Sequence, residues 1–559
     1  MPRLSFFLAA AALPLSALCT FNATSQLFQL AGGADGANNV KFSWELVNGA
    51  AAYNIRQKSA SGDFIATTSP GNVGDVYGLT GGSTIFQIEA VDGNNSTVDT
   101  SMELNITMAA NPGSNLAVYD NMGASTLNDK SKIRTQDGTY YRYITVNDDQ
   151  GFNHISEQTS KDGYNFEGDR QVLNKDVVCT SGTPSDGNCR LEFVNWAQHP
   201  TSGRVIMWAQ FESIGYSQYL VAANGEPGNG NLEFAGVSRP FDELVQEVSF
   251  FADPDIVAGY LICVTNAGDD LTLYGLTQDW TGVESRVTTI QPGERRRAPA
   301  MIKSLGRYYV FSSSEVGEYA SVAKYTSAVG PSGLFYPSRN IGNINTFGAR
   351  SGQIVQIGDT NVMAANIGNS TNNGRQIMLP IATNIGGMAS YHFYPQLNYD
   401  DDAGVLVPVQ NGRIVSVGSP ATASTNSEKA SLANDGIQDQ EENLFESDAV
   451  PFWWEVDLSW THVISQVDVT PRQFLGSETY IQYNVTASND GQTWTTIIDE
   501  SGNQATGFRT ANASDPGDFR YVRVNVNRVV EARTGADAAW AAGLHEVTVY
   551  GDFKRDSSQ

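Results

Sequence analysis

Glutamate and arginine side chains lie close to several short apolar stretches of this chain, and Glu192, Glu247, Arg297 and Arg350 are the most informative of them. A carboxylate can accept hydrogen bonds from two hydroxyl groups at once. Arginine stays protonated at physiological pH, so it binds anions through paired hydrogen bonds but does not deliver a proton usefully. If these groups share one pocket, the arginines either neutralise the carboxylates as a structural network or bind an anionic sugar such as a uronic acid.

The elements that would position these groups are short strands that repeat along the chain. Each repeat has an apolar strand flanked by turn residues, and the repeats start about 50 to 65 residues apart, at residues 138–144, 203–208, 259–264, 308–311 and 360–365. One four-stranded sheet per repeat is typical of a β-propeller blade. We therefore predict a five-bladed β-propeller over residues 111–398, with an axial pocket where the polar ends of the inner strands converge.

Two of these repeats carry motifs that resemble a known family. The sequence DPD at residues 253–255 precedes the third strand, and RRAPAM at residues 296–301 precedes the fourth. These motifs resemble glycoside hydrolase family 43, and the nearest branch is that of the fungal exo-β-1,3-galactanases. The resemblance implies a glycosidase that acts on galactose- or arabinose-containing plant polysaccharide.

The resemblance also implies a role for each carboxylate. Asp129 matches the general base of the wider family, Glu247 the carboxylate that orients and tunes the general acid, and Glu192 a glutamate that contacts the sugar. A solvated turn residue at Asp129 and a capping or surface residue at Glu192 remain open alternatives. We expect Asp253 and Asp255 to be turn residues that hold their loop.

Arginine stands at two positions where the family has other functional residues. Arg297 lies where the resemblance places the general acid, and Arg350 lies where the galactanase branch has a Ser-Gln-Ser run. Hydrolysis by two carboxylates needs both an acid and a base. Either Glu294, Glu315 or Glu318 replaces the acid, or the chain is a non-catalytic polysaccharide-binding propeller. A lyase that uses the arginines to hold a uronate is a third alternative.

Residues 415–552 carry motifs of a different kind, namely ANDG at 433–436, FWWEVDL at 452–458, SNDGQTW at 488–494 and LHEVTVYG at 544–551. They resemble a factor V/VIII type C (discoidin) domain, the fold that family 32 carbohydrate-binding modules also use. The resemblance implies a structural Ca²⁺ near Asp435, with Glu546 approaching it, and oxygen ligands suit that ion. We predict that Trp453 and Trp494 pack in the core. Such a domain would tether the protein to polysaccharide.

Residues 20–110 are predicted to form a small β-sandwich. Residues 40–46 alternate between polar and apolar side chains with Trp44 on the apolar side, and Tyr53 lies on the next expected strand. This pattern resembles a fibronectin type III domain. We expect it to act as a spacer without chemistry of its own.

The N-terminal residues 1–19 have the features of a secretory signal peptide. No later apolar run approaches the ~18 residues that a membrane span needs. Sequons for N-glycosylation occur at Asn22, Asn94, Asn95, Asn105, Asn369, Asn484 and Asn512. Cys179 and Cys189 flank a loop of turn residues and are predicted to form a disulfide, whereas Cys263 is predicted to be a buried thiol. We therefore expect a secreted, extracellular glycoprotein that is a monomer.

Composition narrows the class of partner. The chain has 60 acidic and 34 basic residues and a formal net charge of −26, so nucleic acid and acidic membrane surfaces would be repelled. Neutral polysaccharide remains the easiest partner, and no organic cofactor is expected. The predicted fold class is all-β, with the propeller between the two sandwiches, a linker at 399–414 and a tail at 553–559.

Overall fold

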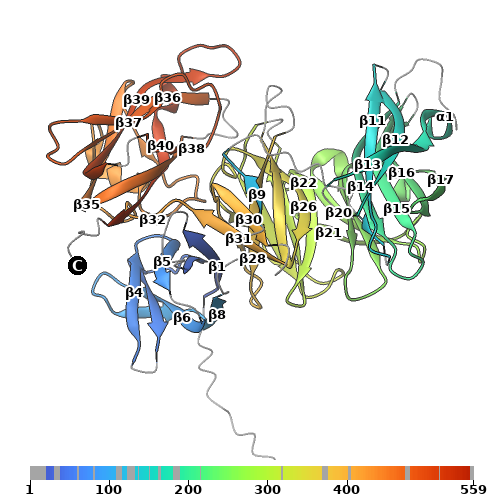
Figure 1. Cartoon of the computed structure of the whole chain (residues 1–559), viewed down its shortest axis with the longest axis horizontal. Helices are drawn as coiled ribbons and strands as arrows, with labels where there is room; N and C mark the ends of the chain where they lie inside the picture. Colours follow the sequence, from blue (N-terminus) through green and yellow to red (C-terminus); the bar gives the residue numbers. More distant parts are fainter. Residues whose placement is uncertain are drawn as a thin grey trace, which may run out of the picture.

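The computed structural model of the chain is built almost entirely of β-sheet (Figure 1). It describes residues 21–30, 38–59, 62–79, 82–108, 116–122, 133–135, 137–149, 151–161, 165–179, 189–213, 216–315, 319–367, 375–400, 404–472, 479–514 and 517–553. Within these ranges, helix is confined to α1 (Lys175–Val178) and four short 3₁₀ segments, which confirms the predicted all-β class. Across the same ranges, no helix has the length and apolar character that a membrane crossing requires.

Five four-stranded antiparallel sheets follow one another along the middle of the chain. They consist of β10 (Ile133–Arg134), β11 (Tyr140–Asp148), β12 (Gly151–Ser160) and β13 (Glu167–Asn174); β14 (Arg190–Gln198), β15 (Val205–Ser213), β16 (Tyr216–Glu226) and β17 (Asn229–Ser238); β18 (Gln246–Ala252), β19 (Gly259–Thr265), β20 (Asp270–Leu276) and β21 (Val283–Ile290); β22 (Arg296–Ser304), β23 (Arg307–Ser314), β24 (Ala323–Ala328) and β25 (Arg339–Ile341); and β26 (Arg350–Ile357), β27 (Thr360–Asn366), β28 (Gln376–Thr383) and β29 (Ala389–Tyr391). From β14 onward, the first strand of each sheet contacts the first strand of the next, so these strands lie around a common centre. We call this arrangement the propeller-like body.

The apolar repeats of the sequence correspond to the second strand of each sheet. In β23, for example, residues 308–313 are all buried. A strand with one solvated face would alternate between buried and exposed side chains. An unbroken buried run therefore indicates that this strand is covered by neighbouring sheets on both faces.

Two sheets pack against each other at the N-terminal end, around a core that includes Phe42, Trp44, Tyr53 and Phe86. One contains β4 (Phe64–Ser69), β3 (Ala52–Lys58), β6 (Gly82–Val91), β7 (Thr97–Thr100) and β8 (Leu104–Met108); the other contains β5 (Val73–Leu79), β2 (Asn38–Trp44) and β1 (Ala23–Leu30) and continues through β31 (Val405–Gln410), β30 (Gln396–Asp400) and β9 (Leu116–Asp120). Strand β9 precedes the propeller-like body, and β30 and β31 follow it. The N-terminal sheets are therefore joined by backbone pairing to the strands that flank that body in the chain. The fibronectin-like character of this region stays a prediction.

One nine-stranded sheet system forms the C-terminal domain. Its strands are β32 (Arg413–Ile414), β33 (Ala421–Ala423), β34 (Phe445–Glu446), β35 (Phe452–Pro471), β36 (Thr479–Ser488), β37 (Thr495–Glu500), β38 (Arg509–Asn512), β39 (Asp518–Glu531) and β40 (Gly543–Phe553). The segment predicted as a linker, 399–414, thus contains the whole of β31 and β32.

The core tryptophan of this domain is Trp454. Buried residues alternate along the first part of β35, and Trp454 lies in that buried set. Trp453 and Trp494 are half-buried, and the guanidinium carbon of Arg523 lies 4.4 Å and 4.0 Å from their ring centres. The prediction that Trp453 and Trp494 pack in the core is therefore wrong, because they flank a cation at the sheet surface.

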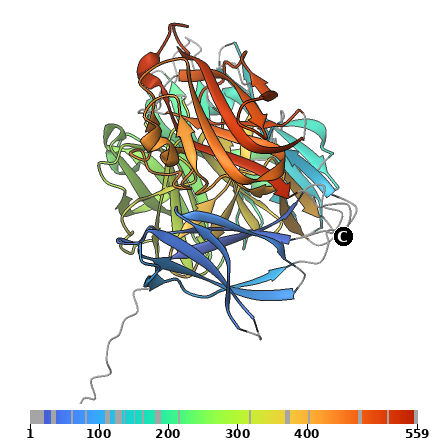
Figure 2. The same cartoon turned by 90° about the vertical axis from the view of Figure 1, so that its left-hand side faces the viewer.

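The C-terminal domain (orange to red) lies beside the N-terminal sheets (blue), and both adjoin the propeller-like body (Figure 2). The ring of Phe508 lies 5.4 Å from that of Phe347 and 5.1 Å from that of Phe393, which joins the C-terminal domain to the body. The ammonium of Lys41, in β2, lies over the rings of Tyr394 and Tyr550 at 5.2 Å and 5.7 Å. These contacts hold the three regions in a fixed arrangement.

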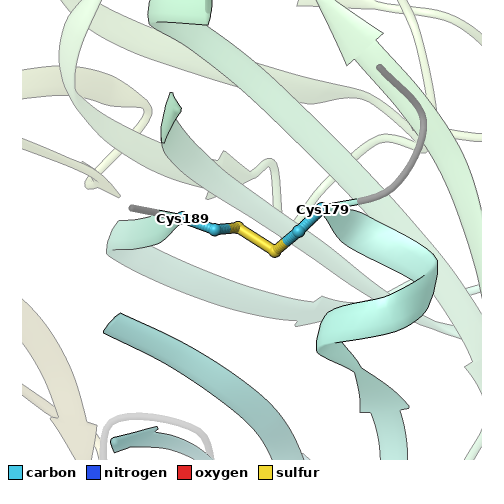
Figure 3. Close-up of a disulfide and its surroundings, with 2 residues drawn as sticks. All are labelled: Cys179 and Cys189. Carbon is cyan, nitrogen blue, oxygen red and sulfur yellow. A yellow bond between two sulfur atoms is a disulfide. The ribbon is translucent and has the colours of Figure 1, made fainter. Parts of the chain in front are cut away.

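The predicted disulfide between Cys179 and Cys189 is confirmed (Figure 3). Both sulfur-bearing residues are buried, and they join the end of α1 to the start of β14. Gly151 passes so close that a Cβ there would lie 2.3 Å from the Cys189 carbonyl oxygen, so only glycine fits at this position. Cys263 is a buried free thiol, as predicted.

Candidate functional site

The first strand of four consecutive sheets carries the same irregularity. One extra residue is inserted into each strand, between Glu192 and Asn195 in β14, Gln246 and Ser249 in β18, Arg297 and Ala300 in β22, and Arg350 and Gln353 in β26. Such bulges re-aim side chains and are frequent at functional sites. Because the four bulges are equivalent, Glu192, Gln246, Arg297 and Arg350 occupy corresponding positions around the centre of the propeller-like body.

Hydrogen bonds from one sheet to the next hold these bulges in place. The backbone N–H of Glu247 donates to Gln210 Oε1 at 2.8 Å, and that of Ala298 donates to Glu247 Oε2 at 2.6 Å. The N–H of Ser351 donates in the same way to Ser313 Oγ, at 2.6 Å. Since buried backbone donors need partners, these side chains fix the position of each bulge relative to the preceding sheet. Glu247 is thus a structural acceptor as well as a candidate functional carboxylate.

Arg297 is enclosed by acceptors. Its Nε atom lies 3.8 Å from Glu247 Oε1, and one terminal nitrogen forms an ion pair with Glu315. The other terminal nitrogen donates to the carbonyl oxygen of Gly268 at 2.7 Å. Gly268 has φ of +104°, and a Cβ there would lie 2.5 Å from the guanidinium, so the chain leaves room for this arginine. We call Glu247, Arg297 and Glu315 the axial charge network.

Glu315 also pairs with Arg295, at 2.8 Å from its Nε atom. Both oxygens of Glu315 are thus occupied by guanidinium groups, one from Arg297 and one from Arg295. Glu294, a second candidate for that role, pairs instead with Lys324 at 3.2 Å and accepts a hydrogen bond from Ser338 at 2.6 Å. The third candidate, Glu318, lies outside the described residues.

Burial raises the pKa of the Glu247 carboxyl above its ordinary value. The Ala298 N–H and the charges of Arg297 and Arg350 act in the opposite direction, but burial prevails. The neutral, proton-bearing form of Glu247 is thus easier to populate than that of an exposed glutamate.

The structure brings together three of the residues singled out from the sequence, namely Glu247, Arg297 and Arg350, whose charge acts on Glu247. Glu192 lies at the corresponding position of the preceding sheet, where its side chain is exposed opposite Gln210. Asp129, the expected general base, lies outside the described residues. Sequence reasoning missed Gln210, whose only sequence signal is its place in the strand paired with β14.

Asp253 serves the loop between β18 and β19. Its carboxylate is buried, accepts the N–H of Asp255 at 2.9 Å and pairs with Lys303 at 2.8 Å. The hydroxyl of Tyr308 donates to the same carboxylate. Asp253 is therefore a buried structural acceptor between the third and fourth sheets of the body.

A buried carboxylate, Glu546, and a half-buried one, Asp435, interact electrostatically in the C-terminal domain. Glu546 is 2% exposed, and no donor among the described residues bonds either of its oxygens with good geometry. Asp435 Oδ1 accepts the N–H of Ile437 at 2.9 Å and an amide hydrogen of Asn443 at 3.0 Å. Burial raises the pKa of Asp435 to about 6, and burial together with Asp435 raises that of Glu546 further still.

These two carboxylates fit the predicted calcium site. Unsatisfied buried carboxylate oxygens are costly unless a cation neutralises them, and Ca²⁺ prefers oxygen ligands. Across the described residues, no group of three or more His, Cys, Asp or Glu side chains could hold a metal. Asp435 and Glu546 would therefore be the side-chain carboxylates of the site, with backbone or amide oxygens completing it.

Comparison with known proteins gives one family match, within the C-terminal domain, and similarity in fold to solved structures. The F5/8 type C family described as a NedA-like, galactose-binding domain matches residues 432–524, within the C-terminal domain. In fold, the chain is similar to a glutamate-to-alanine variant of an exo-β-1,3-galactanase from Phanerochaete chrysosporium with β-1,3-galactotriose, at 16% identity over 78% of this chain and 100% of that chain, with a TM-score of 0.50. It is also similar to an exo-β-1,3-galactanase from Clostridium thermocellum, at 17% identity over 78% and 97% of the two chains, with a TM-score of 0.46. None of the curated proteins shows significant sequence similarity to this chain.

Proposed function

We propose that this chain is a secreted carbohydrate-active protein that binds galactose- or arabinose-containing polysaccharide through its propeller-like body, without two-carboxylate hydrolysis. The fold that it shares with an exo-β-1,3-galactanase, which was solved with galactotriose, supports a carbohydrate ligand. The match of the C-terminal domain to galactose-binding domains supports the same class of partner. Two sugar-binding regions in one chain would raise its retention on an insoluble polysaccharide.

The observation that carries the proposal is the position of Arg297 in the axial charge network. The guanidinium lies where the resemblance places the proton donor, and Glu247 and Glu315 hold it there. Arginine does not release a proton at physiological pH. The proton donor that two-carboxylate hydrolysis requires is therefore replaced by an ion-paired arginine.

The same network favours a neutral sugar over a uronate. Two carboxylates already neutralise Arg297, and Glu315 also engages Arg295. A uronate would have to displace one of these carboxylates, and displacement of Glu247 would separate a largely buried carboxylate from Arg297. Glu192 is exposed at the corresponding bulge of β14, so its carboxylate is accessible and can accept hydrogen bonds from sugar hydroxyls.

Glycoside hydrolysis is the second candidate function, and the raised pKa of Glu247 favours it. Burial favours the proton-bearing form of the Glu247 carboxyl, which is the form that a general acid needs. In this alternative Glu247 donates the proton to the leaving oxygen, and Asp129 would be the base. Glu247 Oε2 accepts the Ala298 N–H, so Oε1 would be the donating oxygen.

Secretion, a monomeric state and a structural Ca²⁺ at Asp435 and Glu546 are also part of the proposal. The calcium would neutralise these two carboxylates and stabilise the C-terminal domain. Chelation should lower the unfolding temperature of the wild type, and a Glu546→Gln variant should lose much of this response. An equal response in both proteins would contradict Glu546 as a ligand.

The test combines binding and product analysis. Wild type, Arg297→Glu and Glu247→Gln are incubated with β-1,3-galactan, arabinogalactan, arabinan and pectic polysaccharide, and products are identified by mass spectrometry. Retention without product in the wild type supports the binding proposal. Saturated products that disappear in Glu247→Gln would establish the second candidate, and unsaturated products would indicate a lyase. Absence of both retention and product would refute the proposal.

A further inference from the structure

A hollow of about 540 Å³ lies between the N-terminal sheets and the C-terminal domain. Its N-terminal wall comes from β3, β4 and β5, and its C-terminal wall comes from β32 and the middle of β35, regions that lie side by side in both views (Figures 1 and 2). We call it the interdomain groove and use Phe64, Tyr77, Arg413, Trp460 and His462 to define it. Its volume falls within the roughly 300–1,000 Å³ of small-ligand sites.

The two walls of the groove are held in a fixed arrangement. The backbone N–H of Ile414 donates to Asp75 Oδ2 at 3.3 Å, and the guanidinium of Arg413 lies 5.8 Å from the centre of the Tyr77 ring. Both contacts join the C-terminal domain to β5 of the N-terminal sheets. A ligand therefore meets walls that are already placed, which reduces the ordering cost of binding.

Each wall contributes an exposed aromatic ring. Trp460, in the C-terminal wall, is 70% exposed, and Phe64, in the N-terminal wall, is 48% exposed. The Nδ1–H of His462 donates to the Trp460 carbonyl oxygen at 2.8 Å, which fixes the backbone beneath the indole. Rings that keep so much apolar area in water, inside a hollow, mark a ligand site.

The chemistry of the lining selects a neutral polyhydroxyl ligand. Most of the groove surface is polar, and Gln57 and Thr67 are among the residues that line it, so a lipid tail would leave polar groups unsatisfied. Arg413 and Asp75 carry opposite charges, which offset each other. Burial lowers the pKa of His462, so its imidazole is neutral at pH 7. Sugar rings offer what this lining requires, since their C–H faces cover aromatic rings and their hydroxyls bond to the polar side chains.

We propose that the interdomain groove binds a neutral oligosaccharide segment, with Trp460 and Phe64 as its two stacking surfaces. The inference rests on the proposed function for the identity of the ligand as carbohydrate. It adds a second place of contact, away from the axial charge network. It also gives the N-terminal sheets a part in binding, beyond that of a spacer.

The experiment uses the full chain and separates this site from the propeller-like body. Affinity electrophoresis in gels that contain β-1,3-galactan, arabinogalactan or arabinan compares wild type with Trp460→Ala and Phe64→Ala. Trp540→Ala is the matched control, since Trp540 belongs to the same domain, is 58% exposed and does not line the groove. Circular dichroism and the unfolding temperature confirm that each variant is folded.

We expect Trp460→Ala and Phe64→Ala each to weaken retention about tenfold, the loss typical of removing an aromatic anchor from an interface. Trp540→Ala should stay within about twofold of the wild type, and indole fluorescence should change on binding in the wild type but not in Trp460→Ala. Equal retention of Trp460→Ala and Trp540→Ala would overturn the proposal that the groove binds oligosaccharide. A wild type that no polysaccharide retains would overturn it as well. Loss of retention in Arg297→Glu, with full retention of Trp460→Ala, would support binding at the propeller-like body and refute binding in the groove. Loss of retention in Trp460→Ala, with full retention of Arg297→Glu, would support binding in the groove alone.

Discussion

Replacing Arg297 by methionine tests the axial charge network directly. The change keeps most of the apolar length of the side chain and removes the guanidinium. The side chain of Arg297 is 14% exposed. It breaks the ion pairs to Glu247 and Glu315 and the 2.7 Å hydrogen bond to the Gly268 carbonyl oxygen. Glu247 is then left as a largely buried carboxylate that has lost the nearer of the two arginines acting on it.

The expected cost follows from these contacts. Removing one partner of a buried ion pair costs about 3–5 kcal/mol. The lower end applies here, about 3 kcal/mol, because Glu315 is partly exposed and keeps its contact with Arg295. For a region of this size, about 3 kcal/mol corresponds to a fall of roughly 6 °C in unfolding temperature.

The cost should depend on pH with a definite sign. Arg297 is among the groups that lower the pKa of Glu247 against the raising effect of burial, so its removal raises the folded-state pKa further above the unfolded value. A carboxyl with a raised folded-state pKa destabilises the native state at pH values above it and ceases to do so when it is protonated. The difference between variant and wild type should therefore be larger at pH 7.5 than at pH 5.

The assay is thermal unfolding at both pH values, with Arg295→Met as control. Arg295 contacts the same Glu315, but its side chain is 66% exposed, so its loss should cost about 1 kcal/mol or less at either pH. A similar small effect for both variants, or a cost of Arg297→Met that does not shrink at pH 5, would refute the view that Arg297 neutralises a buried carboxylate.

Three further outcomes follow from packing and covalent structure. Cys263 should resist alkylation in the native protein and react after unfolding, because it is buried and burial raises its thiol pKa; rapid native labelling would contradict this. Replacing Cys179 and Cys189 together by serine should cost about 2–3 kcal/mol for a loop of ten residues, read as a lower unfolding temperature and faster proteolytic cleavage between the two positions. Phe508→Ala should remove the ring contact with Phe347 and cost about 3 kcal/mol, with looser docking of the C-terminal domain in small-angle scattering; an unchanged scattering profile would argue against this contact as the joint.

The sequence predicts what depends on local pattern. Short apolar runs between turn residues identified the second strands of the propeller sheets. In β23, for example, the run is unbroken because the strand is buried on both faces. The cysteine pair was predictable because a short loop keeps Cys179 and Cys189 close in any fold. Arg297 could be recognised as an unusual residue in its motif, since the comparison needs only local spacing.

The partners of Arg297 depended on strand register. The sequence offered Glu294, Glu315 and Glu318 as neighbours without a basis for choice. Pairing of β22 with β23 brings Arg297 opposite Ser313 and next to Glu315, whereas Glu294 turns toward Lys324. A one-residue shift of register reverses the face of every side chain, so spacing along the chain could not decide these contacts.

Strand register and domain packing also explain why the burial of the tryptophans and the interdomain groove could not be predicted from the sequence. Trp453 and Trp454 are adjacent, so only the phase of β35 decides that Trp454 is buried and Trp453 stacks on Arg523. The interdomain groove pairs Phe64 with Trp460, which lie nearly 400 positions apart in the chain. Sequence by itself determined which residues are apolar, charged or covalently paired; the tertiary structure alone decided which distant ones meet, because contacts between distant segments arise from sheet pairing and domain packing, which local periodicity does not encode.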